Sequence, residues 1–242
     1  MLTAEVLRLV NSAYFGLSRE VTSINHAVVY VGINTVKNVA IALATKGALP
    51  TKNKAGLDMR QFWEHSLTVG IIAKKVMEAR GGESKQDANF FVAGLLHDIG
   101  KIIFAHFMPD DYKQVIDEID EAPWSLTRAL VAEKNILGFD HGEVGAVLAE
   151  KWKLPDDLAC SIGCHHKIEL ASTQSDLLFA TASANIISHV IERRESHPDE
   201  SLSIEVPKVL EDWLGAPVEG ILDKICGLDE ELEKAKAFIE VN

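Results

Sequence analysis

Positive charge and cysteine are both scarce in this sequence. Its 242 residues include 24 lysines and arginines against 36 aspartates and glutamates, so the formal net charge is −12. Nucleic-acid binders need a basic face to neutralise phosphates, and basic segments are what anionic membranes attract. We therefore expect no nucleic acid and no membrane as partner. The three cysteines, Cys160, Cys164 and Cys226, are too few and odd in number for a disulfide framework.

Long apolar runs are also missing, since no run approaches the roughly 20 residues that cross a bilayer. The N-terminus carries Glu5 and Arg8 inside its apolar pattern, which is not a signal-peptide layout. With so few cysteines, this favours a reducing, cytoplasmic setting. Hydrophobic residues nevertheless make up 47% of the chain and charged residues 25%. That composition is typical of a folded globular protein and not of a disordered one.

Apolar residues recur every three or four positions along almost the whole chain, and no stretch shows the alternation typical of strands. We therefore predict an all-α, multi-helix bundle. The first expected helix carries Val6, Leu9, Val10 and Ala13 on one face. The further expected helices are 24–31, 33–48, 59–79, 87–97, 110–119, 124–135, 141–152 and 175–193, one from Pro155 to about His165, and two or three short ones after Glu205.

Two polar segments rich in helix breakers divide the chain. Pro50–Gly56 and Glu195–Ser203 interrupt the helical pattern. We predict an N-terminal helical part at 1–55, a larger helical domain at 56–194, and a C-terminal helical extension at 195–242 that packs on the same unit.

Histidines gather at four helix regions, one of them beside an aspartate. Imidazole and carboxylate together suit Zn, Fe, Mn or Ni. Adjacent helical residues diverge by about 100°, so His97 and Asp98 can reach one ion only where a helix ends. We predict that Ile99-Gly100 supplies that end, because glycine permits a turn. The residues that could share a polar cluster are His65, His97, Asp98, His141, His165 and His166.

The other interpretation is that a single histidine on an apolar helix is an ordinary core or surface residue with a hydrogen bond. Four histidines are assigned to that class: His26, His106, His189 and His197. For the remaining histidines both interpretations stay open, and with them the presence of a bound metal.

Two sets of motifs resemble the HD superfamily, and within it the HDOD (HD-related output domain) branch. The first comprises FWEHS (62–66), LLHDIGK (95–101), FDHGEVG (139–145), WxLP (152–155) and His165-His166. The second comprises VLRLVNSAYFG (6–16) and the segment 22–44 that follows it. The resemblance spans about residues 2–190 and implies an HD-like bundle with an N-terminal HDOD subdomain. Such domains begin with one or two further helices, so it also implies a short or truncated N-terminus.

The resemblance also implies a set of metal ligands for one or two divalent ions. HD phosphohydrolases use a histidine, a His-Asp pair and a distal aspartate, which correspond to His65, His97-Asp98 and the helix around 177–190. Asn185 stands at the distal position, and an amide is a neutral and weaker ligand; Asp176 lies about two and a half turns upstream. His141, His165 and His166 match the extra ligands of the two-metal HD-GYP branch.

The sequence departs from the catalytic pattern after the paired histidines. HD-GYP phosphodiesterases continue with a GYP-containing substrate motif, whereas this chain continues with Lys167-Ile168-Glu169-Leu170. Lys101 is retained, and in catalytic relatives this lysine faces substrate phosphate, a role that suits a point cation. The alternative is a solvated lysine at a helix end.

The resemblance supports two functions. The first is a bacterial signal-transduction output module with a degenerate metal site, which acts through contacts with signalling proteins. The second is a metal-dependent phosphohydrolase acting on a nucleotide or cyclic dinucleotide, with Asp98 and Lys101 as catalytic residues and a small phosphate compound as ligand. In it, Asp98 would bridge or orient a metal-activated water. Asn185 and the missing GYP motif favour the first, and the nearly complete histidine set favours the second.

Overall fold

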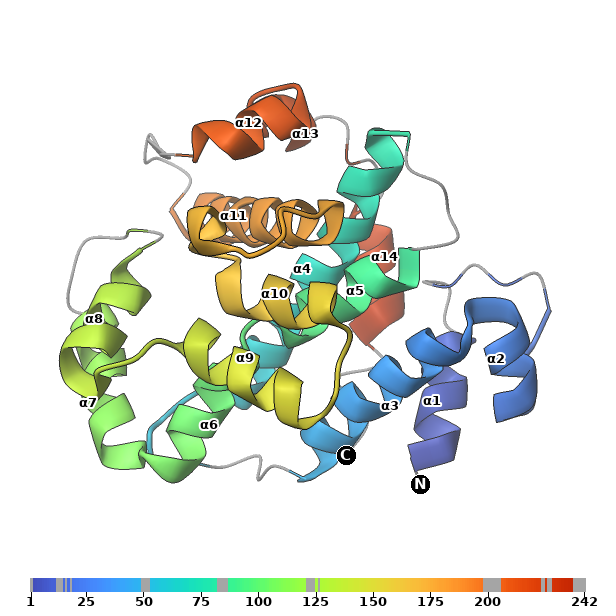
Figure 1. Ribbon diagram of the computed structural model, residues 1–242, viewed down its shortest axis with the longest axis horizontal. Coiled ribbons are helices and arrows are strands. Elements are labelled where there is room, and N and C mark those ends of the chain that lie inside the picture. Colours follow the sequence, from blue (N-terminus) through green and yellow to red (C-terminus); the bar gives the residue numbers. More distant parts are fainter. Residues whose placement is uncertain are drawn as a thin grey trace.

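The computed structural model describes residues 2–11, 15, 17, 19–48, 53–81, 87–120, 125, 127–197, 206–222, 225 and 228–236. Within these ranges the chain forms helices and no strand, which confirms the all-α prediction (Figure 1). The elements are α1 (Leu2–Val10), α2 (Ile24–Val31), α3 (Ile33–Ala48), α4 (Met59–Ala79), α5 (Asp87–Leu96), α6 (Ile99–Phe107), α7 (Pro109–Asp120), α8 (Arg128–Leu137), α9 (His141–Lys151), α10 (Asp156–Cys164), a 3-10 turn (Ile168–Leu170), α11 (Asp176–Ser196), α12 (Lys208–Leu214), α13 (Val218–Leu222) and α14 (Leu228–Lys236).

Helices α4 and α11 are the long elements that organise the bundle, with 21 residues each. Each begins at a capping residue, Asp58 for α4 and Ser175 for α11, whose side chain accepts backbone N–H groups of the first turn. Helices α11 and α5 both pack along α4, and they also contact each other (Figure 1). The stretch from Leu178 to Ser188 of α11 is buried throughout, so this helix runs through the interior.

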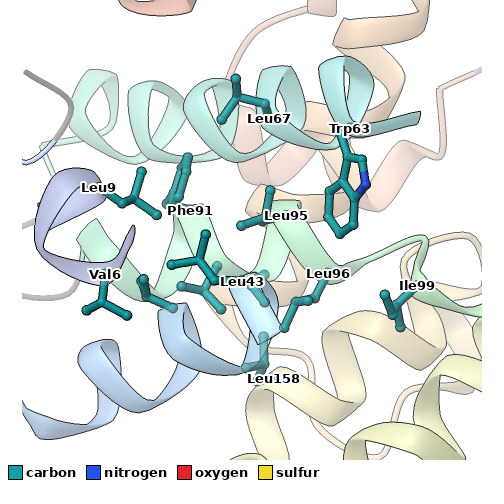
Figure 2. Packing of buried hydrophobic residues seen from close by; sticks show 14 of the residues in the cluster. Val6, Leu9, Leu43, Trp63, Leu67, Phe91, Leu95, Leu96, Ile99 and Leu158 are labelled. Atoms are coloured by element: carbon teal, nitrogen blue, oxygen red, sulfur yellow. The ribbon is translucent and has the colours of Figure 1, made fainter. Parts of the chain in front are cut away.

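The main apolar core joins the N-terminal helices to the rest of the chain. Val6 and Leu9 of α1 pack with Leu43 of α3 against Phe91 and other α5 side chains (Figure 2). The same cluster continues into α4 and α10. The core is therefore continuous across the predicted boundary at residue 55, and the three-part division of the chain stays a prediction.

A side-chain clamp closes the loop that follows α1. The amide of Asn11 donates from Nδ2 to the Val21 carbonyl at 2.7 Å, and its Oδ1 accepts from the Val21 N–H at 2.6 Å. Asn11 belongs to the N-terminal motif 6–16; residues 12–14 and 16 of that motif, like Cys226, lie outside the described ranges.

The predicted break at Ile99-Gly100 is wrong by two residues. Helix α5 ends at Leu96, and α6, which the sequence did not predict, begins at Ile99 with Asp98 as its N-cap residue. Gly100 is helical, and its role is close packing: a Cβ atom there would lie 2.0 Å from the carbonyl oxygen of His141. The backbone of α9 can therefore approach α6 only at a glycine.

The apolar run from Asn89 to Phe107 corrects the expectation that no run approaches membrane-spanning length. It has 19 residues with a mean hydropathy of 1.4, enough by length and composition alone. In the structure it is two helices broken at His97-Asp98, and 78% of it is buried inside the protein. Core helices show the same pattern, and the cytoplasmic setting stays a prediction.

Candidate metal centre

The structure brings every predicted site residue to one place in the bundle. We define the His–Asp cluster as His65, His97, Asp98, His141, His165 and His166. These residues come from α4, the α5–α6 junction, the start of α9 and the end of α10. Asn185 reaches the cluster from α11, and Lys101 reaches it from α6.

Asp98 lies at the centre of the cluster, with 1% of its surface exposed. Its Oδ1 atom is 3.1 Å from Nε2 of His141 and 3.6 Å from Nε2 of His165. Its Oδ2 atom is 3.4 Å from Nε2 of His97 and 3.9 Å from Nε2 of His65. Burial alone would raise the pKa of this carboxyl, but His97, Lys101 and His141 hold it well below its usual range. Asp98 is therefore a buried carboxylate.

The two oxygens of Asp98 divide the potential ligands into two sets. We call His65, His97, Asp98 and Asn185 the His65 half, and Asp98, His141, His165 and His166 the His141 half. In each half the histidine and Asp98 ligand atoms lie within 4.8 Å of one another. Asp98 belongs to both halves, as a carboxylate shared by two ions would.

The ring nitrogens of four histidines are arranged as metal ligands are. Each Nδ1 atom lies within hydrogen-bond distance of an acceptor, so Nε2 is the ring atom that faces Asp98 and is placed to ligate a metal. The Nδ1 acceptors are the Gly94 carbonyl for His97 (2.7 Å), the Ile162 carbonyl for His165 (2.9 Å), Glu133 for His141 (2.7 Å) and Glu192 for His65 (2.8 Å).

Two observations test whether a metal fits here. The Nε2 atom of His97 is buried without a hydrogen-bond partner. The Nε2 atoms of His141 and His165 lie 3.4 Å apart, both beside Oδ1 of Asp98. A cation bound between these groups would contact all three atoms, and one beside His97 would satisfy its orphaned nitrogen. The residues present fit a divalent metal, and a set rich in imidazole suits Zn, Fe or Ni better than Mg or Ca.

Burial and mutual proximity keep most of the histidines neutral. Burial lowers the pKa of His97 well below its ordinary value, and it does the same for His166. His141 is the exception. Burial opposes its protonation, but the charges of Glu133 and Asp98 raise its pKa to about 9. In the absence of a metal, a proton on His141 thus occupies the place between these two carboxylates.

Asn185 stands at the distal-ligand position that the resemblance indicates. Its side chain is buried, and its Oδ1 atom is 3.1 Å from Nε2 of His65. Asp176, the weaker candidate, is the first residue of α11 and accepts a hydrogen bond from the Trp213 indole at 2.9 Å. The His65 half thus contains an amide where a second carboxylate would stand.

Lys101 is part of the cluster and not a solvated helix-end lysine. Its Nζ atom donates to Oδ2 of Asp98 at 2.6 Å, and 18% of its side chain is exposed. Burial opposes its charge, but Asp98 and Glu133 raise its pKa. The ammonium group therefore bonds to the oxygen of Asp98 that faces the His65 half.

Three further residues at the cluster escaped the sequence analysis. His189, which was expected to be an ordinary histidine, stacks on His65 at 4.6 Å between ring centroids, and its Nδ1 lies 3.2 Å from Glu192. Asn185, His189 and Glu192 follow helical spacing on one face of α11, a signal that could have found them. Glu133, on α8, carried no such signal in the sequence.

A cleft of about 540 Å³ adjoins the cluster beside His65 and Glu192. It lies between α4, the end of α11 and α14. We call it the glutamate cleft, because four of the residues that line it are Glu64, Glu192, Glu195 and Glu233.

The helical bundle and the His–Asp cluster define a protein of the HD superfamily type. The family model of the HDOD domain matches residues 1–168. The chain therefore belongs to the HDOD family, which confirms the resemblance seen in its motifs.

Solved structures support this membership. An HDOD domain protein of Geobacter sulfurreducens is 26% identical with a TM-score of 0.62, covering 98% of this chain and 79% of that one. A candidate phosphohydrolase of Shewanella amazonensis is also 26% identical, with a TM-score of 0.70, covering 98% of this chain and 82% of that one. A candidate signal transduction protein of Marinobacter aquaeolei, 21% identical, shares the fold, with a TM-score of 0.70 over 98% of this chain and 51% of that one.

A curated relative is much longer than this chain. A protein of Treponema pallidum is 26% identical over 189 residues, which cover 74% of this chain and 34% of the relative. This chain thus spans about a third of the length of the curated relative it matches.

Proposed function

We propose that this protein is a signal-transduction output module whose His–Asp cluster holds a divalent metal, and that it acts through contacts with signalling proteins. In this proposal the metal-bound cluster stabilises the fold of the module, and its main function is not the hydrolysis of phosphate esters. HDOD membership and the likeness to a candidate signal transduction protein support the output role.

The acidic character of the glutamate cleft is the observation that carries this proposal. The cleft adjoins the cluster at His65, and four glutamates line it. Asp98 and His141, by contrast, are closed off from solvent. A phosphate ester carries negative charge, and the carboxylates of this cleft disfavour an anion that enters through it, although Arg60 pairs with Glu64 at 2.9 Å. Structural metal sites are closed, whereas catalytic sites keep an open position.

The ligand set supports the same proposal. A bound divalent metal would supply a Lewis acid that lowers the pKa of a coordinated water. Asp98 would have to orient that water, yet its Oδ2 atom already accepts the Lys101 ammonium at 2.6 Å. Asn185 adds no charge to the ligand set. The side chains that remain position a cation well but leave little to activate a water.

The second candidate function is a metal-dependent phosphohydrolase. Four Nε2 atoms converge on one carboxylate, and a buried lysine stands beside it, as phosphate chemistry would require. The likeness to a candidate phosphohydrolase at 26% identity agrees with this function. The substrate class would be a nucleotide or cyclic dinucleotide.

Metal content and turnover together decide between the two functions. Untagged protein, purified without chelators, is analysed by elemental mass spectrometry and then reloaded with Fe, Mn, Zn or Ni. We expect at least one equivalent of metal and no turnover of bis(p-nitrophenyl) phosphate or a cyclic dinucleotide. Turnover that Asp98→Ala abolishes would establish the hydrolase instead. Less than about a tenth of an equivalent after reloading would overturn the metal-holding role.

A further inference from the structure

The two halves of the His–Asp cluster share Asp98 unequally. The Oδ2 atom, which faces His97 and His65, accepts the Lys101 ammonium at 2.6 Å. The Oδ1 atom faces Nε2 of His141 at 3.1 Å and Nε2 of His165 at 3.6 Å. A cation in the His65 half would compete with an ammonium for its oxygen. A cation in the His141 half would not.

A buried glutamate stands behind the His141 half. Glu133 of α8 is 0% exposed, and its Oε2 atom accepts from Nδ1 of His141 at 2.7 Å and from the backbone N–H of His141 at 2.9 Å. Its Oε1 atom is buried without a hydrogen-bond partner. Burying a carboxylate is costly unless its charge is used.

Helix capping does not account for Glu133. Helix α9 already has a capping box, in which Asp140 accepts from the Glu143 N–H at 3.0 Å and Glu143 accepts from the Asp140 N–H at 3.1 Å. A neutral acceptor would serve the remaining N–H of His141 equally well. We therefore assign the negative charge of Glu133 to its contact with the imidazole ring of His141.

The carboxylates behind the two halves differ in burial. Glu192, which holds His65, has 44% of its side chain exposed, whereas Glu133 has none exposed. Charge in a dry environment acts more strongly than charge beside water. A carboxylate that holds a metal-ligating histidine fixes its tautomer and makes it a better ligand.

We infer that the His141 half is the tighter metal subsite of this protein and that Glu133 is the positioning residue that makes it so. This inference rests on the proposed metal-holding function. The ligand set has an amide at Asn185 in place of a carboxylate. The Glu133 carboxylate, which bonds to Nδ1 of His141, supplies negative charge to the other half instead. The first metal ion consequently binds Asp98 Oδ1 together with the histidines of the His141 half.

One equivalent of Zn²⁺ or Co²⁺, added to metal-free protein against a competing chelator, tests this inference. We expect His65→Ala to keep the tight equivalent and His141→Ala to lose it. Glu133→Gln should weaken binding by about 10- to 100-fold and shift the visible spectrum of bound Co²⁺. Glu143→Gln, a control at the same helix end whose carboxylate pairs with Lys134, should match the wild type.

The opposite pattern, with the tight equivalent lost in His65→Ala and kept in His141→Ala, would overturn the inference and leave the proposed function intact. Wild-type affinity in Glu133→Gln would do the same. A wild-type protein that takes up no metal would overturn both.

A measurement on the unmodified protein covers the case in which a variant fails to fold. With one equivalent of Zn²⁺, nitrogen NMR should show His141 protonated at Nδ1 and metal-bound at Nε2, with His65 unchanged. Metal-induced shifts at His65 and none at His141 would refute the inference.

Discussion

The Nε2 atom of His65 lies 3.1 Å from the amide oxygen of Asn185, at the position where catalytic relatives carry an aspartate. Nδ1 of His65 is directed at Glu192 at 2.8 Å, so Nε2 is the ring atom that would share a cation with the amide oxygen. An amide oxygen carries no negative charge, which makes this a weak cation site.

Restoring the carboxylate should therefore strengthen metal binding in the His65 half. We expect Asn185→Asp to raise the affinity for the second metal equivalent about tenfold or more, equivalent to about 1.4 kcal/mol. Isothermal titration with Zn²⁺ measures it. Asn135→Asp, at an exposed asparagine of α8 outside the cluster, should leave the affinity unchanged. Equal affinities for Asn185→Asp and wild type would show that the amide does not limit binding.

Gly100 should tolerate no side chain, because a Cβ atom there would lie 2.0 Å from the His141 carbonyl oxygen. We expect Gly100→Ala to lower the free energy of unfolding by about 1–3 kcal/mol and to weaken metal binding, since the start of α9 must move. Gly220→Ala is the matched control: its Cβ would meet Ala216 at 3.9 Å, and it should be neutral or stabilising by up to about 1 kcal/mol. Denaturant unfolding compares the two, and a stable, metal-binding Gly100→Ala protein would contradict the packing argument.

Tyr112 should report the buried charge of Glu133. Burial, followed by the charges of Glu133 and Asp98, raises the pKa of this phenol well above its ordinary value. The unfolded chain releases the phenol proton near pH 10, whereas the folded protein keeps it to higher pH. The contribution of Tyr112 to the free energy of unfolding is therefore fully present below pH 10 and is lost as the pH rises above it. Absorbance near 295 nm, with Tyr112→Phe as reference, follows the titration. Glu133→Gln should bring the pKa of Tyr112 closer to its usual range, and an unchanged pKa would mean that the Glu133 side chain does not influence the phenol.

Removal of metal should destabilise the protein. A ligand at about 100 times its Kd adds about 2.7 kcal/mol to the folded state, which corresponds to about 5–10 °C in Tm at this chain length. Scanning calorimetry before and after chelation measures the change. His165→Ala, which lacks a ligand of the His141 half, should show a smaller shift on chelation. Identical Tm values with and without bound metal would contradict this prediction, because they would show that metal binding does not stabilise the fold.

Local sequence patterns were enough to predict most of the helices, because one buried face per helix imposes a spacing of three to four residues. Helices 24–31, 33–48 and 59–79 agree with the structure at both ends. The α5–α6 junction was misplaced, since Gly100 serves packing against His141 and not a turn. A close approach between two helix backbones leaves no periodic signal.

The identities of the ligand residues were readable in the motifs, and the structure brings His65, His97, Asp98, His141, His165, His166 and Asn185 together. The inequality between the two halves was not readable there. It depends on Lys101 bonding to one oxygen of Asp98 and on Glu133, from a helix without a motif, reaching Nδ1 of His141. The sequence alone determines which side chains are able to bind a metal, through their type and their order in the chain. The strength with which each side chain binds depends on its burial and on its hydrogen-bond partners. Both arise only when helices that are distant in the sequence pack together.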